Sequence, residues 1–193
     1  MPNQLKAPGF MQRVVPVSVK TWHWMIAEGM APKRAELIRG VIIEKMSKSI
    51  LHSQIASILA RTLELLVGMT FWVRREDPLT LEESEPEPDV SVVAGRPQDY
   101  PAHPSTAKLV IEVSVSTLAE DREMAGIYAE AQVEEYWLVN ASERNIEMHR
   151  RPMNGHYSEK EIVPFTATIS SQSLPEVTID LSVIFAGLPA TKA

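Results

Sequence analysis

Two short apolar runs, separated by a proline-rich loop, each carry a carboxylate into what should be the interior of the fold. Residues 90–93 directly follow Asp89, and residues 109–113 contain Glu112. Runs of Val, Ile and Leu this short, bounded by Pro and Gly, are typical of buried strands rather than of helices. We therefore expect two strands that each hold an acidic side chain.

The two acids are candidates for a divalent metal site. Charged carboxylates are rarely buried unless they are paired, hydrogen-bonded or bound to a cation. The loop between the runs is long enough to fold back, so the strands could lie side by side with both carboxylates converging. Mg²⁺ prefers oxygen ligands and is commonly held by one or two carboxylates together with waters and a substrate phosphate. Asp89, Glu112 and the earlier Glu36 are the acids that we expect there.

The same three acids also allow an interpretation without chemistry. Asp89 could cap a turn after Pro88, Glu112 could point outward from an edge strand, and Glu36 could lie on a solvated surface. Single acids in strands are common enough that spacing alone does not decide between the two interpretations.

The remaining segments predict helices and strands arranged around these runs. Ser18 can cap a helix that ends near Gly29, and Thr117 with Glu120 fits a capping box for a helix that runs to about Gln132. The pattern predicts a hairpin at residues 35–46 and an amphipathic helix at residues 50–67. Strands are expected at residues 70–74, 135–139, 144–149, 157–163 and 167–170, and a last short helix at residues 181–186. This order predicts an α/β fold of the mixed α+β type, with one central sheet flanked by helices over residues 18–193 and an irregular arm over residues 1–17.

Composition excludes several classes of function. Of the 193 residues, 45% are hydrophobic, which is ample for one core. The absence of cysteine excludes disulfides and a thiolate nucleophile. The formal net charge of −6 gives no overall attraction to polyanions, so nucleic-acid binding needs a local basic patch. The sequence lacks a membrane-spanning run and the basic and apolar regions of a signal peptide, so we expect a cytoplasmic protein without a membrane partner.

Several short motifs follow one another in a characteristic order. They are EPEPDVSVV around Asp89, LVIEVS around Glu112, DR at 121–122, YAEA from Tyr128 and EEYWLVN from Glu134. Together with residues 36–40, 46, 52 and 157, they resemble the Uma-two family of predicted endonucleases. That family belongs to the PD-(D/E)XK, restriction-endonuclease-like superfamily, and the resemblance covers roughly residues 18 to 186.

This resemblance implies a metal-dependent endonuclease that hydrolyses phosphodiester bonds in DNA. Its central mixed sheet would place Asp89 and Glu112 as ligands of Mg²⁺ or Mn²⁺. Glu36 would be a supporting acid, reached from the hairpin, and Arg122 would lie near the phosphate. A homodimer is expected as well, because cutting both strands of a duplex needs two sites.

The sequence departs from the family where a catalytic lysine is expected. The residue two positions after Glu112 is Ser114, and the alternative position on the next helix is Ala125 or Met124. None of these is basic, and Arg122 could stabilise a phosphate but could not act as a base.

Two metals can in principle activate water without lysine. The alternative is a catalytically inactive binding or regulatory module that keeps the nuclease fold, and a third possibility is a hydrolase of small phosphodiesters.

A few other polar residues are weaker candidates. His52 matches a recurrent family position but can equally be a polar residue in the first turn of a helix. Lys45, Lys48 and the pair at 74–75 could contact phosphates, although most such residues are solvated surface.

Overall fold

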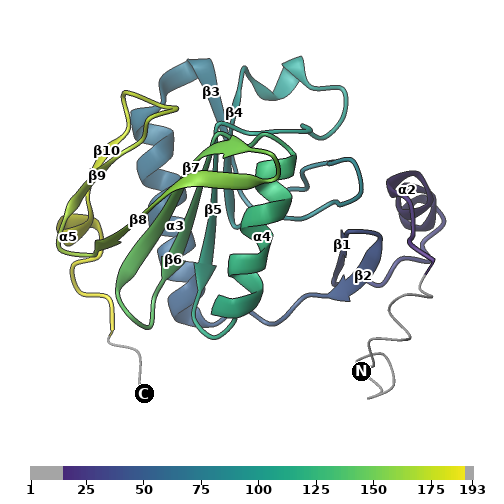
Figure 1. Ribbon diagram of the computed structural model, residues 1–193, viewed down its shortest axis with the longest axis horizontal. Coiled ribbons are helices and arrows are strands. Elements are labelled where there is room, and N and C mark those ends of the chain that lie inside the picture. The colour runs from purple at the N-terminus through teal and green to yellow at the C-terminus, as the bar shows by residue number, and fades with distance from the viewer. Residues whose placement is uncertain (1–14, 190–193) are drawn as a thin grey trace.

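The centre of the fold is a six-stranded mixed sheet, and the prediction of a central sheet flanked by helices is confirmed (Figure 1). The structure is a computed structural model that describes residues 15–189, so most of the expected N-terminal arm lies outside the described residues. β5 and β6 are parallel, and the other neighbouring pairs in this sheet are antiparallel. The strands in order are β3 (Phe71–Arg74), β4 (Val90–Ala94), β5 (Leu109–Ser114), β6 (Glu135–Asn140), β7 (Asn145–Met153) and β8 (His156–Pro164).

Two long helices cover opposite faces of this sheet, as Figure 1 shows. α3 (Ile50–Leu66) packs against the face that carries Ile111 and Trp137. α4 (Leu118–Glu130) packs against the face that carries Val110 and Tyr136, and it forms the crossover between parallel β5 and β6. Because side chains alternate along a strand, β5 and β6 contribute to both cores at once.

The N-terminal part adds a helix and a hairpin beside the sheet. α2 (Val19–Ala27) has Ser18 as its N-cap, as predicted, and buries Trp22 against the hairpin of β1 (Ala35–Ile38) and β2 (Val41–Glu44). The predicted hairpin is therefore confirmed. A backbone bridge between Leu37 and Glu85 ties it to the segment that leads into β4.

The turn of this hairpin requires a glycine. Arg39 and Gly40 have φ values of 47° and 71°, which suit a tight two-residue hairpin turn. A Cβ on Gly40 would also lie 2.4 Å from the Cβ of Pro16, so the chain before α2 packs directly on the turn.

The C-terminal segments close the core on the α3 side of the sheet. Their apolar side chains, including Leu181 and Phe185, belong to the same cluster as the α3 residues. These segments are β9 (Thr168–Ser170), β10 (Thr178–Asp180) and α5 (Leu181–Ile184), and two 3₁₀ helices elsewhere cover Gly68–Thr70 and Pro97–Asp99. Across residues 15–189, no helix combines the length and apolar character needed to cross a membrane.

One local prediction is wrong. Thr117 precedes α4, but its side chain makes no capping hydrogen bond to the helix backbone. The Thr117 hydroxyl instead donates to the carboxylate of Asp121, at 2.6 Å. The capping-box pattern fails because the Thr117 backbone, with φ −110° and ψ 20°, lies outside the extended region that is usual for an N-cap.

Candidate active site

The register of two antiparallel strands brings Asp89 and Glu112 together. Val90 of β4 pairs with Ile111 of β5, and continuing this register by one residue sets Asp89 opposite Glu112. The backbone N–H of Asp89 donates to Oε2 of Glu112 at 3.1 Å, and the N–H of Val113 donates to Oδ2 of Asp89 at 2.8 Å. Each carboxylate is thus held by the backbone of the other acid's strand.

Burial and mutual repulsion act strongly on Glu112. Burial, followed by the charge of Asp89, raises the pKa of Glu112 well above its usual value. A hydrogen bond from the Tyr128 hydroxyl to Oε1, at 2.7 Å, opposes this rise. Ionising Glu112 beside Asp89 is unfavourable without a nearby cation, which is the electrostatic condition that a divalent metal satisfies.

Two basic side chains contact Asp89, one just before the N-cap of α3 and one in its first turn. Lys48 Nζ lies 2.7 Å from Oδ1, and His52 Nε2 lies 2.9 Å from Oδ2. Burial by itself would raise the pKa of Asp89, but His52 and Lys48 outweigh it and hold the pKa below its usual value. The Ser49 side chain accepts the His52 N–H at the helix N-cap, which fixes the histidine on the first turn.

A third acid faces the pair from α4. Burial raises the pKa of Asp121, and the charge of Asp89 adds to this effect. Asp121 in turn contributes to the raised pKa of Glu112. Asp121 and Tyr128 are seven residues apart, so they share one face of α4, and this spacing was the available sequence signal for both.

Glu36 lies at the side of the pair rather than within it. Its carboxylate accepts the backbone N–H of Glu87 at 3.1 Å, two residues before Asp89. Burial raises the pKa of Glu36. The charge of Glu36 also acts on Tyr128, so it belongs to the same electrostatic environment.

Arg122 points to a different cluster on the same face of the sheet. Its guanidinium binds Glu147 of β7, with Nε 3.0 and 3.2 Å from the two carboxylate oxygens, and Lys160 of β8 reaches Glu147 at 2.6 Å. Glu112 pairs with Leu138, which pairs with Glu147, so this cluster lies two strands away from the acid pair, roughly 10 Å at the usual strand spacing. The contact of Arg122 with a phosphate stays a prediction.

Arg74 illustrates why a basic pair in the sequence is weak evidence for phosphate binding. Its side chain is buried, donates to the carbonyl of Pro78 at 3.0 Å and stacks 4.8 Å from the ring centroid of Trp72. It therefore supports the interior of the fold.

The donor set of the acid pair fits Mg²⁺ or Mn²⁺. Within residues 15–189, no group of three or more His, Asp or Glu side chains is arranged to hold a metal ion by itself. Asp89 and Glu112 supply hard oxygen donors, and Mg²⁺ commonly completes its shell with waters and a substrate phosphate. The pKa of Glu112 is raised mainly by burial and then by the charge of Asp89, and a divalent cation bound there would offset both effects.

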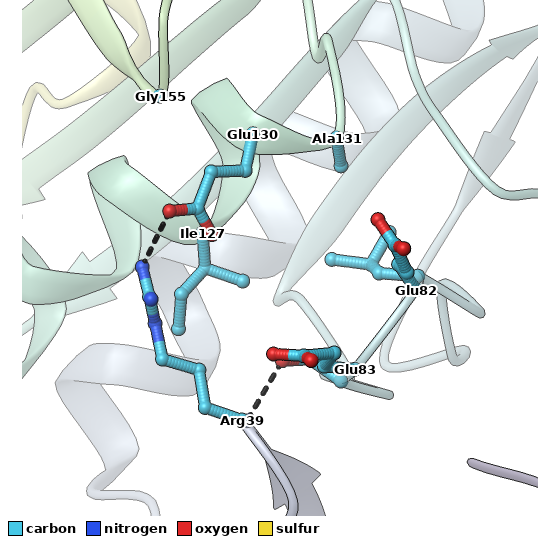
Figure 2. Close-up of a pocket in the computed structure, with 9 residues that line it drawn as sticks. Arg39, Glu82, Glu83, Ile127, Glu130, Ala131 and Gly155 are labelled. Carbon is cyan, nitrogen blue, oxygen red and sulfur yellow. Dashed lines mark hydrogen bonds and ion pairs between the residues drawn. The ribbon is translucent and has the colours of Figure 1, made fainter. Parts of the chain in front are cut away.

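A separate cavity of about 470 Å³ opens beside the hairpin turn (Figure 2). Arg39 crosses it to Glu130, with Nη2 and Oε1 2.9 Å apart. Glu82 and Glu83 also line it, and the lining includes neither Asp89 nor Glu112. Its charged lining consists of three glutamates and one arginine, which makes it unsuited to a phosphate backbone.

The six-stranded mixed sheet flanked by helices is a nuclease-like fold. The chain belongs to the Uma2 family, described as "Putative restriction endonuclease", which matches residues 28–183. It is similar in structure to a putative nuclease belonging to DUF820 from Anabaena variabilis ATCC 29413. The TM-score is 0.75 at 18% identity, over 90% of this chain and 100% of the other. Comparison with curated proteins gives no match.

Proposed function

We propose that this protein is a metal-dependent endonuclease that hydrolyses phosphodiester bonds in DNA. The observation that carries the proposal is the hydrogen-bonded, facing pair of Asp89 and Glu112 in a chain of the Uma2 family. A cytoplasmic location and a homodimeric assembly, with one site for each DNA strand, are parts of the same proposal.

Asp89 and Glu112 would hold the metal directly, and Glu36 would assist directly or through water. When bound, the metal supplies an acidified water and neutralises charge on the phosphate. The N–H of Val113 and the hydroxyl of Tyr128 orient the two carboxylates for this task.

The reaction itself is a simple displacement at phosphorus. The oxygen of water forms a bond to phosphorus while the bond to one sugar oxygen breaks. The water loses a proton and the departing sugar oxygen gains one, which leaves a phosphomonoester and a hydroxyl. No covalent enzyme intermediate is needed, which agrees with a site without a cysteine nucleophile.

The direct test incubates purified protein with supercoiled plasmid and Mg²⁺ or Mn²⁺. We expect nicking by the wild type, and a loss of at least about 10²-fold in Asp89→Ala and in Glu112→Ala. Glu134→Ala is a matched control, because Glu134 is a more exposed acid paired with Lys108. Nicking that survives both site substitutions would place the active site elsewhere. Single-stranded DNA, RNA and small phosphodiesters in parallel reactions define the substrate class.

The missing lysine favours one other candidate, a binding or regulatory module that keeps the fold without catalysis. Ala125 lies on α4 between Asp121 and Tyr128, on the face that meets the acid pair. If the wild type is inert and Ala125→Lys cuts DNA, the departure is a loss of catalysis. A wild type that cuts well excludes this candidate.

A further inference from the structure

A lysine outside the expected motif positions reaches the acid pair. Lys48 precedes the N-cap of α3, and its Nζ lies 2.7 Å from Oδ1 of Asp89, a residue 41 positions further along the chain. The same ammonium lies 3.1 Å from the carboxylate of Glu76. Its side chain is 24% exposed, so it stands between a buried acid and the solvent.

The residues around Lys48 fix the position of its ammonium. Four residues later, His52 contacts the other oxygen of Asp89, and Ser49 caps the helix between them. The start of α3 is therefore bound to Asp89 through two side chains. The carboxylates of Asp89 and Glu76 both hold the Lys48 ammonium at this position.

A protein cation beside the metal would favour phosphodiester hydrolysis. Negative charge builds on the phosphate oxygens as water attacks, and the facing carboxyl groups of Asp89 and Glu112 supply no positive charge to offset it. Ser114 and Ala125 are neutral, and the guanidinium of Arg122 is bound to Glu147. Lys48 is a cation in direct contact with the acid pair.

The geometry points to Lys48 as the ammonium that stabilises the charge developing on the phosphate and orients the attacking water. Lys48 supplies the positive charge that the neutral side chains of Ser114 and Ala125 cannot provide. This inference rests on the proposed nuclease function.

The inference separates catalysis from metal binding. A metal at Asp89 competes with the ammonium for the same carboxylate, so removing the ammonium should leave metal affinity unchanged or increase it. Removing a preorganised charge at a reacting phosphate should lower turnover by about 10²-fold. A lysine that merely supported Asp89 would behave in the opposite way, since its loss would weaken the metal site.

The experiment measures Mn²⁺ affinity by calorimetry and plasmid nicking at saturating Mn²⁺, for wild type, Lys48→Ala, Lys48→Arg and Lys45→Ala. We expect Lys48→Ala to bind Mn²⁺ at least as tightly as wild type and to cut about 10²-fold more slowly. Lys48→Arg, which keeps the charge, should cut at least tenfold faster than Lys48→Ala. Lys45 is the matched control, because it lies three residues earlier and pairs with Glu87 instead of Asp89.

Each contrary outcome has a distinct meaning. Equal nicking by wild type and Lys48→Ala, or restoration of Lys48→Ala by excess Mn²⁺ after weakened binding, overturns the role of Lys48. A comparable loss in Lys45→Ala also overturns it, because general positive charge in the segment then explains the effect. A wild type that does not nick DNA, and whose Mn²⁺ binding is unaffected by Asp89→Ala, instead contradicts the proposed function.

Discussion

At the scale of single residues, the site depends on the hydrogen bonds that orient its carboxylates. Glu112 receives one bond from a backbone N–H and one from the Tyr128 hydroxyl, so both of its oxygens have fixed directions. Groups that hydrogen-bond to a metal-binding carboxylate strongly influence metal affinity, although they do not touch the metal themselves. Tyr128 is the residue where this effect can be measured most clearly.

Tyr128→Phe should lower Mn²⁺ affinity by about 10–100-fold, because Glu112 loses the bond that orients Oε1. Tyr136→Phe is the matched control. Tyr136 is equally buried and packs on Tyr128, but its hydroxyl donates to the backbone carbonyl of Asp121. Both variants should lose about 1–2 kcal/mol of unfolding free energy. Calorimetric titration and thermal unfolding measure the two quantities, and equal Mn²⁺ affinities would contradict the orienting role of Tyr128.

The sequence allowed the acid pair to be predicted, but not the cations around it. Asp89 and Glu112 stand in short apolar runs, so strand geometry limits where they can go. Lys48 and Arg122 have long side chains on solvent-facing segments, and their partners are set by packing of distant elements. Neither local propensity nor spacing contains that information.

At the scale of elements, strands and helices with strong apolar patterns were predictable, whereas side-chain competition at their ends was not. The α3 helix and the β1–β2 hairpin follow directly from apolar spacing and from Arg39–Gly40. The Thr117 hydroxyl shows the limit, because it donates to Asp121 and accepts no backbone N–H of α4. The position of the hairpin matters for the proposed function, because β1 carries Glu36.

Gly40→Ala tests how tightly this hairpin is fixed. The substitution adds a Cβ 2.4 Å from Pro16 and places alanine at a φ of 71°, so we expect a loss of about 2–4 kcal/mol in unfolding free energy. Gly187→Ala is the control, because Gly187 has a φ of 79° but no atom within 4 Å of the added Cβ. It should lose only about 1 kcal/mol. Chemical denaturation measures both, and equal losses would mean that the hairpin moves away from Pro16 at little cost.

At the scale of the whole molecule, charge pairs within the α4 face determine how stability responds to acid. Glu147 is buried between Arg122 and Lys160, which lower its pKa to about 2 against the effect of burial. Burial, followed by the charge of Lys160, lowers the pKa of His149 to about 4. Both groups therefore favour the folded state near neutral pH.

The sign of the pH effect follows from these two shifts. As the pH falls below 6.5, His149 takes up a proton in the unfolded chain but not in the folded chain until about pH 4. Unfolding free energy should therefore decrease by about 1–2 kcal/mol across that window, after allowance for solvent screening. Protonation of Glu147 should lower the unfolding free energy further between pH 4.5 and about 2.

Thermal unfolding of wild type and His149→Phe from pH 7 to 4 measures the first contribution. Phenylalanine can occupy the place of the imidazole between Tyr136 and Tyr157 without taking up a proton. The variant should lose less stability than wild type between pH 6.5 and 4. Parallel curves for the two proteins would assign the acid sensitivity to other groups.

The crossover helix between β5 and β6 also has a consequence for the order in which the protein gains its activity. The acids of β4 and β5 leave the ribosome before Tyr128, and β5 lacks its parallel neighbour until residues 135–140 have followed. A nascent chain that stops between them has both carboxylates but lacks the Tyr128 hydroxyl that binds Oε1 of Glu112. Under the proposed function, cutting ability should thus appear late in synthesis, and incomplete chains should leave DNA intact.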